Sequence, residues 1–238
     1  MSDGPAYRRV LLKLSGEALM GPLDSGVHTA TLDELARQVA EVCALGTRVG
    51  IVVGGGNFWR GLSGVGRKFD RARSDTIGML ATVMNCLVFR DALERCGVEC
   101  SVMTALEMPR VAETFVRERA QSYFELGKVV LFGAGTGHPY FSTDTAAALR
   151  ALEIGAEALL KATKVDGVYS NDPTEDPGAV RYDRISYKEV LERGLRFMDA
   201  TAVALCMENR LPVHVFNCRV PGNLLAVVRG DPVGTVVS

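Results

Sequence analysis

Short runs rich in aliphatic and β-branched residues alternate with amphipathic helical stretches along the whole sequence. Helices are predicted over Thr31 to Leu45, from about Ser74 to Arg95, and over Thr145 to Glu153. The predicted strands are Arg9 to Leu14, Val49 to Val53, Glu99 to Met103, Lys128 to Phe132, Ala158 to Lys161 and Val213 to Phe216. Such alternation is typical of a mainly parallel sheet with helices on both faces. The sequence therefore predicts an α/β fold, a three-layer αβα sandwich, and its 238 residues fit one domain over residues 1–238.

Two segments carry the pattern of a capping box, in which a Ser or Thr and a Glu three residues later satisfy each other's backbone N–H groups. Thr31 with Glu34 precedes one apolar helical pattern, and Ser186 with Glu189 precedes Val190 and Leu191. We expect a helix to begin at each of these two pairs.

The charge of the chain is nearly balanced, with 27 basic and 28 acidic residues and a formal net charge of −1. No global field would hold a nucleic acid or an anionic membrane, so an anion needs a local site. Lys13 interrupts the first apolar run, which argues against a signal peptide, and no apolar stretch approaches the roughly 20 residues of a bilayer span. We expect a cytoplasmic protein without nucleic-acid or membrane partners.

Six cysteines and three histidines occur in the chain, and no two cysteines have the Cys-x-x-Cys spacing. That spacing is the usual sign of a zinc or redox site. We therefore expect reduced thiols buried in the core and no metal site built by the protein.

Three segments interrupt the regular alternation: Ser15 to Thr29, Gly54 to Arg73, and Thr163 to Gly178. Each follows a predicted strand and is rich in Gly, Pro, Asp or Ser. In a parallel sheet such segments gather at the carboxyl edge, where open α/β sheets bind their ligands.

The first two of these segments begin with residues that suit a phosphate. Lys13 stands near the end of the first strand and is followed by Ser15 and Gly16, whose turn can offer backbone N–H groups. The alternative is a lysine that reaches the surface from an edge strand. Three glycines, Gly54 to Gly56, follow the second strand, and Arg60 lies just beyond them. A plain tight turn needs fewer glycines.

A third glycine-rich turn, Gly133 to Gly137, has the wrong spacing for a dinucleotide-binding fingerprint, because His138 stands where the third glycine is required. Thr136 to Thr143 instead forms a longer cradle lined with hydroxyl groups. Asp144 follows it near a helix start, where it either caps the helix or serves as a functional carboxylate. The chain contains no Walker A sequence and no protein-kinase catalytic loop.

The last of these segments again places a lysine at a strand end, because Lys161 is followed by a turn and by Tyr169. The Asp166-Gly167 and Asp172-Pro173 steps are equally explained as ordinary turn chemistry.

Together these segments resemble the amino acid kinase fold family and, within it, the bacterial UMP kinases (uridylate kinases), over essentially the whole chain. The markers are Leu12 to Leu19, Gly54 to Asn57 with Arg60-Gly61, Met79 to Asn85, Arg90 to Leu93, Lys161 to Asp172, and Val215 to Asn217. The resemblance implies the amino acid kinase fold and direct phosphoryl transfer from ATP to UMP, giving ADP and UDP in the biosynthesis of the pyrimidine nucleotides CTP and UTP.

The resemblance also implies two sets of contacts. ATP contacts would come from Lys13, Leu14, Ser15, Gly16, Gly56, Arg60, Thr163, Tyr169 and Asp172. UMP contacts would come from Gly55, Asp75, Thr136, Gly137, His138, Pro139, Tyr140, Phe141, Ser142 and Thr143. A dependence on Mg²⁺ with ATP, a homohexamer built from dimers, activation by GTP and inhibition by UTP are further implications.

The sequence departs from the family in two places. His138 stands where the family usually has Asn, which affects the contact to the acceptor base. The stretch Gly21 to Thr29 departs from the family's usual Gly-Ile-Asp ending, which affects regulation by GTP.

The residue types suit this chemistry. The phosphate of a nucleoside monophosphate is largely ionised at neutral pH, since its second pKa is about 6, so no general base is needed. Lys13 and Lys161 would contact the transferring phosphoryl group, and Asp144 would hold the two lysines in register. Asp75 suits ribose hydroxyls, because a carboxylate accepts hydrogen bonds from a diol and repels phosphate. The predicted catalytic residues are thus Lys13, Lys161 and Asp144.

Two alternatives remain open at this point. The first is another kinase of the same fold with carbamate, aspartate or acetylglutamate as acceptor, for which another arginine near Thr136 to Thr143 would be expected. The second is a noncatalytic nucleotide-binding relative, against which the presence of both Lys13 and Lys161 argues.

Overall fold

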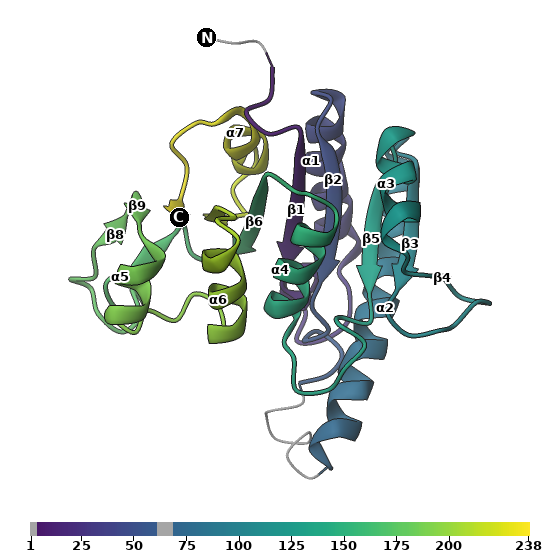
Figure 1. Ribbon diagram of the computed structural model, residues 1–238, viewed down its shortest axis with the longest axis horizontal. Helices are drawn as coiled ribbons and strands as arrows, with labels where there is room; N and C mark the ends of the chain where they lie inside the picture. Colours follow the sequence, from purple (N-terminus) through teal and green to yellow (C-terminus); the bar gives the residue numbers. More distant parts are fainter. Residues whose placement is uncertain (1–3, 61–68) are drawn as a thin grey trace.

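A nine-stranded sheet forms the centre of the computed structural model, which describes residues 4–60 and 69–238 (Figure 1). The strands are β1 (Arg9–Leu14), β2 (Arg48–Val53), β3 (Cys100–Thr104), β4 (Glu113–Thr114), β5 (Val129–Gly133), β6 (Ala158–Thr163), β7 (Val168–Tyr169), β8 (Arg181–Tyr182), β9 (Arg184–Ile185), β10 (Val213–Asn217) and β11 (Thr235–Val237). Their order in the sheet is β4-β3-β5-β2-β1-β6-β10-β11-β9, and β7 and β8 form a separate antiparallel pair. Every pair in the large sheet is parallel except β10 with β11, which confirms the predicted mainly parallel sheet.

Helices cover both faces of this sheet, as the alternating pattern predicts. They are the 3-10 helix η1 (Gly16–Leu19) and the α-helices α1 (Thr29–Ala44), α2 (Arg71–Arg95), α3 (Arg117–Glu125), α4 (Thr143–Glu153), α5 (Tyr187–Glu192), α6 (Ala200–Glu208) and α7 (Asn223–Arg229). Helices α1, α2 and α7 pack on one face, and α3, α4, α5 and α6 pack on the other. The predicted three-layer arrangement is therefore present.

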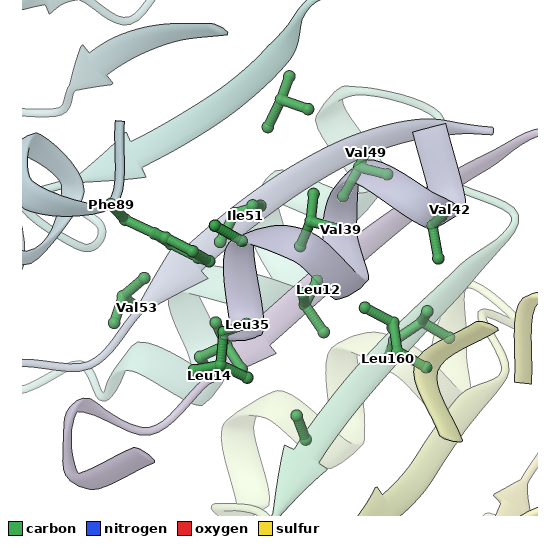
Figure 2. Packing of buried hydrophobic residues seen from close by; sticks show 14 of the residues in the cluster. Leu12, Leu14, Leu35, Val39, Val42, Val49, Ile51, Val53, Phe89 and Leu160 are labelled. Carbon is green, nitrogen blue, oxygen red and sulfur yellow. The ribbon is translucent and has the colours of Figure 1, made fainter. Parts of the chain in front are cut away.

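Side chains alternate along each strand, so the sheet has a separate apolar core on each face. Leu12 and Leu14 of β1 lie with Ile51 of β2 beneath the apolar stripe of α1, which includes Leu35 and Val39 (Figure 2). The residues that alternate with these along β1 and β2 point to the opposite face of the sheet, where they pack against α3, α4 and α6. This two-sided burial explains why the central strands read as nearly continuous apolar runs.

One of the two predicted capping boxes is present. Ser186 Oγ accepts a hydrogen bond from the Glu189 backbone N–H at 3.2 Å, and Glu189 Oε2 accepts one from the Ser186 N–H at 3.1 Å, which confirms the prediction. The box predicted for Thr31 and Glu34 is wrong. Helix α1 begins two residues earlier with His28 as N-cap, and Glu34 is occupied by hydrogen bonds from Arg37 and Gln38.

Helix α2 is long and apolar enough to cross a membrane by length and composition, contrary to the expectation that no stretch approaches that size. Half of its apolar window is buried inside the fold. Cys86, Phe89 and Leu93 are completely buried against the sheet. Helix α2 is therefore part of the core, and its apolar composition follows from that position.

Candidate active site

Two lysines lie side by side on adjacent parallel strands. The register of β1 and β6 pairs Lys13 with Lys161. Because side chains alternate, both lysines share the sheet face of Leu11 and Leu159, which α4 covers. Both are buried, with 9% and 8% of their surface exposed. Two like charges so close together and so far from water require a counter-ion.

Asp144, in the first turn of α4, is that counter-ion. Its Oδ1 lies 2.7 Å from Lys13 Nζ, and its Oδ2 lies 2.5 Å from Lys161 Nζ. Burial raises the pKa of the Asp144 carboxyl, but the two ammonium groups together outweigh that effect and hold the pKa below its usual value. The structure thus brings together the three residues that were predicted to be catalytic. As a cluster they carry one net positive charge.

The surroundings of Lys161 lower the pKa of its ammonium group. Burial lowers its pKa, the neighbouring Lys13 charge lowers it further, and Asp144 offsets only part of both effects, leaving the pKa at about 8. Lys161 is therefore charged at neutral pH but close to losing its proton.

The start of α4 explains how Asp144 is free to bind the lysines. Ser142 is the N-cap, and its Oγ accepts hydrogen bonds from the backbone N–H groups of Asp144 and Thr145 at 3.0 and 3.1 Å. The alternative interpretation, in which Asp144 caps the helix, is therefore wrong. The Ser142 hydroxyl donates to Asp199, the N-cap of α6, and Asp199 also accepts from Thr145 Oγ1 at 2.9 Å.

Asp199 was not found from the sequence. It joins the starts of α4 and α6 and so fixes where Asp144 stands. The only available signal was an Asp directly before a helix-forming run at Ala200.

The turn after β1 packs backbone against backbone on the glycine turn after β2. A Cβ on Gly16 would lie 2.5 Å from Gly54 O and from Asn57 Oδ1, so no larger residue fits there. Buried Asn57 and Asn85 exchange two amide hydrogen bonds of 2.9 and 2.7 Å, and Asn85 Nδ2 also donates to Gly54 O at 2.7 Å. The glycine turn is thereby attached to α2. A Cβ on Gly56 would meet only Glu17 Cγ, at 4.0 Å, so this glycine leaves open space beside the turn.

A second carboxylate with two cations lies nearer the surface, and sequence reasoning missed two of its members, Glu17 and Lys164. Glu17 Oε1 lies 2.8 Å from Arg60 Nη2, and its Oε2 lies 2.6 Å from Lys164 Nζ. The hydrogen bond from Lys164 is the main cause of a lowered pKa at Glu17, and the charges of both cations add to it. Arg60, a predicted ATP contact, is thus held beside the turn after β1. Gly61, its partner in the sequence marker, lies outside the described residues.

The other predicted ATP contacts near these turns differ in where their side chains lie. Leu14 is buried in the core, so only its backbone faces the turn. Ser15 caps η1, its Oγ accepting from the Glu17 N–H at 3.2 Å. Thr163, at the end of β6, donates its hydroxyl to Val165 O at 2.5 Å.

A small cavity of about 130 Å³ opens on the β2 and β5 side of the lysines. Six of the predicted UMP contacts line it: Gly55, Asp75, Thr136, His138, Phe141 and Thr143. Gly137, Pro139, Tyr140 and Ser142 are not part of its lining. Sequence reasoning missed Trp59, Ser74, Gly78, Met79, Thr82 and Gly135, which come from the loop after β2, from α2 and from the loop after β5. We call this space the acceptor-side cavity.

Asp75 is held at the rim of the acceptor-side cavity by two contacts. Its Oδ2 accepts hydrogen bonds from Arg71 Nε and from the Tyr140 backbone N–H, both at 2.8 Å. Tyr140 has a φ of 72°, which is unusual for a residue with a side chain. Asp75 therefore fixes the backbone of the predicted UMP cradle.

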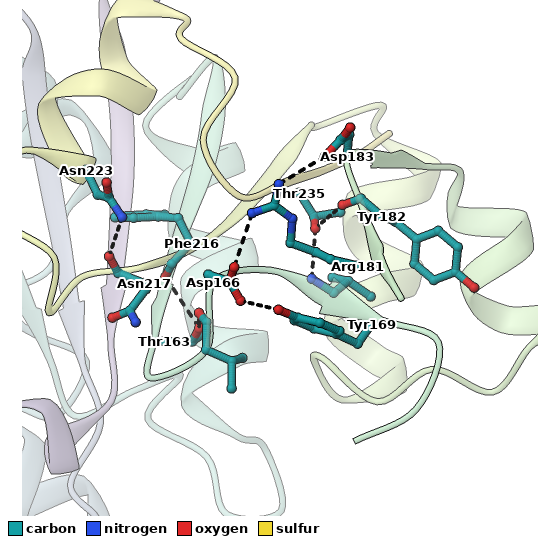
Figure 3. Close-up of polar contacts among 12 residues, drawn as sticks. Thr163, Asp166, Tyr169, Arg181, Tyr182, Asp183, Phe216, Asn217, Asn223 and Thr235 are labelled. Atoms are coloured by element: carbon teal, nitrogen blue, oxygen red, sulfur yellow. Dashed lines mark hydrogen bonds and ion pairs between the residues drawn. The ribbon is translucent and has the colours of Figure 1, made fainter. Parts of the chain in front are cut away.

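A larger cavity of about 360 Å³ lies beyond β6. Two predicted ATP contacts, Tyr169 and Asp172, line it. Tyr169 donates its hydroxyl to Asp166 Oδ1 at 2.5 Å, and Arg181 Nη1 reaches the other oxygen of Asp166 at 3.2 Å (Figure 3). Sequence reasoning missed the opposite wall, residues 193–197. We call this space the donor-side cavity.

The strand order sets the relation between these parts. The acceptor-side cavity lies at the ends of β2 and β5, the lysines lie on β1 and β6, and the donor-side cavity lies beyond β6. The charged cluster therefore stands between the two cavities, at the carboxyl edge of the sheet.

The residues around this cluster do not form a metal cage. Over the described ranges, 4–60 and 69–238, no group of three or more His, Cys, Asp or Glu side chains is placed to hold a metal ion. The nearby carboxylates Asp144 and Glu17 each already bind two cations.

Comparisons with known proteins place this fold in one family. The family model described as the amino acid kinase family matches residues 8–217. The solved structure of a UMP kinase from Bacillus anthracis is 36% identical with a TM-score of 0.94, covering 98% of this chain and 96% of that one. A UMP kinase from Ureaplasma parvum is 35% identical with a TM-score of 0.92, covering 97% and 98%. A uridylate kinase from Archaeoglobus fulgidus is 31% identical with a TM-score of 0.75, covering 96% and 99%.

The parallel sheet, its charged carboxyl edge and these matches define a phosphotransferase of the kinase class. The chain belongs to the amino acid kinase family.

The pKa of Lys161 gives a prediction for activity against pH. Below about pH 8 the ammonium is charged and can meet a phosphate, and above it the charge is lost. If ATP is the donor, as the resemblance implies, we expect kcat/KM for ATP to be level between about pH 7 and about pH 8, where the substrate phosphates are ionised, and then to fall about tenfold per pH unit, measured in steady-state assays at constant ionic strength. A Lys161→Arg variant should lack this fall up to pH 10, whatever its absolute rate, because the guanidinium keeps its charge. A wild-type profile that stays level to pH 10 would contradict the assignment.

Proposed function

We propose that this protein is a UMP kinase that transfers the terminal phosphoryl group of ATP directly to UMP, giving ADP and UDP for the synthesis of UTP and CTP. The observation that carries the proposal is the Lys13–Asp144–Lys161 cluster, because it places two fixed positive charges between two cavities. Phosphoryl transfer needs in-line positioning and neutralisation of charge on the moving group more than it needs covalent chemistry.

In this mechanism the two lysines contact the phosphoryl group as it moves. Each is preorganised by Asp144, so little reorganisation accompanies the reaction. The acceptor phosphate is already ionised, since its second pKa is about 6, and no general base is required. The open space beside Gly56 and the backbone of the turn after β1 would hold the phosphates of ATP, with Arg60 supplying a further positive charge.

The acceptor-side cavity favours a nucleotide over a small carboxylate. Its lining combines aromatic and hydroxyl groups with Asp75, and no arginine of the described residues lines it. A carboxylate acceptor such as acetylglutamate would need an arginine there that binds it with two hydrogen bonds. At the rim of this cavity, Arg71 donates its Nε–H to Asp75.

We assign Mg²⁺ to the substrate rather than to the protein. The carboxylates at the site are used by lysines and an arginine, which leaves a poor donor set for a resident ion. Mg²⁺ commonly arrives bound to nucleotide phosphates and keeps several waters. When bound, it would neutralise part of the charge on the ATP phosphates.

The wider setting is proposed from the family resemblance. With the UMP kinase assignment, we also propose that the protein is a cytoplasmic homohexamer that GTP activates and UTP inhibits. His138, which lines the acceptor-side cavity, is the position at which the contact to the base is expected to differ from the family.

The acceptor is tested by a coupled assay of ADP formation. With ATP and Mg²⁺ present, UMP should support turnover at least a hundredfold faster than acetylglutamate, and faster than CMP. Turnover with acetylglutamate alone would select another kinase of the same fold. ATP binding without ADP formation for any acceptor would select the noncatalytic alternative.

Asp75→Asn tests the acceptor-side cavity separately from the donor side. The substitution keeps the shape but removes the charge that accepts from a diol, so we expect KM for UMP to rise about tenfold, with KM for ATP changed less than twofold. Glu208→Gln, at an exposed position at the end of α6, is a suitable control, since it should leave both KM values unchanged. Equal increases in both KM values for Asp75→Asn would remove Asp75 from the acceptor site.

A further inference from the structure

Two glycine turns that border the acceptor-side cavity lie against the same stretch of α2. They follow β2 and β5, and α2 packs beside both strands (Figure 1). A Cβ on Gly55 would lie 2.7 Å from Gly78 O, and a Cβ on Gly133 would lie 3.1 Å from Val83 Cγ2. Helix α2 therefore sets how close both turns stand to the cavity.

The turn after β5 begins with a backbone conformation that its sequence does not favour. Ala134 has a φ of 61°, in the left-handed region that a Cβ disfavours, and it is completely buried. Gly135 follows with a φ of 57°, and the Gly137 N–H closes the turn by donating to Ala134 O at 2.9 Å. Such a conformation persists only where the surrounding structure holds it, so the turn needs a contact that fixes Ala134.

A hydroxyl group of α2 supplies that contact. The buried Thr82 Oγ1 accepts a hydrogen bond from the Ala134 backbone N–H at 2.8 Å. Thr82 Oγ1 also donates its own hydrogen to Met79 O at 2.7 Å, one turn back along the helix. Because that donation fixes the direction of the hydroxyl group, its oxygen is left to accept from Ala134. Without the hydroxyl group, the buried Ala134 N–H would lose this partner.

The residues that follow Ala134 face the acceptor side of the site. Gly135, Thr136 and His138 line the acceptor-side cavity, and Thr82 lines it from α2. The His138 N–H donates to Thr136 Oγ1 at 3.2 Å, which joins these two residues. A shift of the backbone at Ala134 would therefore displace this part of the cavity wall.

We propose that Thr82 is a positioning residue for the acceptor. Its hydroxyl group holds Ala134 in the left-handed conformation and so sets where the cradle of residues 136–143 meets the acceptor nucleotide. This inference rests on the function proposed above, since it concerns the acceptor of that reaction. Thr82 acts through the turn rather than on the reacting atoms, so its loss should impair use of the acceptor and leave binding of the donor unchanged.

The test compares three variants in the coupled assay of ADP formation. Thr82→Val keeps the shape of the side chain and removes the hydroxyl group, and Thr82→Ser keeps the hydroxyl group. Thr76→Val is the matched control, because Thr76 is exposed on the same helix and its hydroxyl group donates to Ala72 O of that helix. For Thr82→Val we expect kcat/KM for UMP at saturating ATP to fall about tenfold. The other two variants should stay within twofold of the wild type, and Kd for ATP without acceptor should change less than twofold in all three.

Hydrogen–deuterium exchange at the Ala134 amide tests the contact without any turnover. Mass spectrometry with fragmentation to single residues follows this amide in the whole protein. It should exchange at least tenfold more slowly in the wild type and in Thr82→Ser than in Thr82→Val. An Ala134 amide that exchanges in the wild type as fast as in an unstructured peptide would overturn the inference, even if Thr82→Val does not fold.

The kinetic outcomes separate this inference from the proposed function. An unchanged kcat/KM for UMP in a folded Thr82→Val, the same loss in Thr82→Ser, or a tenfold weaker binding of ATP would each overturn the role of Thr82. A wild type that is inactive with UMP but active with another acceptor would contradict the proposed function instead. The three variants are then compared with that acceptor, and the same tenfold fall is expected for Thr82→Val.

Discussion

The ion pairs of Asp144 with Lys13 and Lys161 are the interaction on which the rest of the active site depends. The parallel register forces the two lysines next to each other on one face of the sheet. Their repulsion and their loss of water are tolerated because one carboxylate meets both, at 2.7 and 2.5 Å. Removing one partner from a buried charge cluster typically costs about 3–5 kcal/mol. The position of α4, fixed through Ser142 and Asp199, is therefore part of the chemistry as well as of the fold.

Glu17 also pairs with two cations, Arg60 and Lys164, and we call these three residues the outer cluster. Its ion pairs differ from those of Asp144 in how much they stabilise the protein. The side chains of Arg60 and Lys164 are more than half exposed, at 53% and 51%. Ion pairs in such positions contribute about 0–1 kcal/mol each. The ion pairs of Glu17 therefore hold their partners less firmly than the buried pairs of Asp144 do. In the proposed reaction, a fixed inner cluster and a weaker outer one would suit a site that admits ATP and then holds its terminal phosphate.

The fold and the pair of lysines were predictable from sequence because both follow from local patterns, whereas the place of Asp144 between the lysines came from analogy with the fold family. Apolar runs gave the central strands, and lysines near two strand ends gave the pair that is predicted to be catalytic. The residues that were missed act across the fold: Asp199 joins two helices distant in sequence, and Glu17 matters only because η1 brings it between Arg60 and Lys164. The capping box at Thr31 failed because its Glu34 found partners on the same helix. Trp59 and Met79 line the acceptor-side cavity because of how α2 packs in the fold. No rule of residue spacing in the sequence predicts that packing.

The most direct test of the account is the kcat of an Asp144→Asn variant at saturating ATP and UMP. Asparagine keeps the size of the side chain but removes the charge that holds the two lysines together. We expect kcat to fall a hundredfold or more, which is about 2.7 kcal/mol of barrier or above, while thermal unfolding shows that the variant is folded. A folded Asp144→Asn protein with the kcat of the wild type would contradict it.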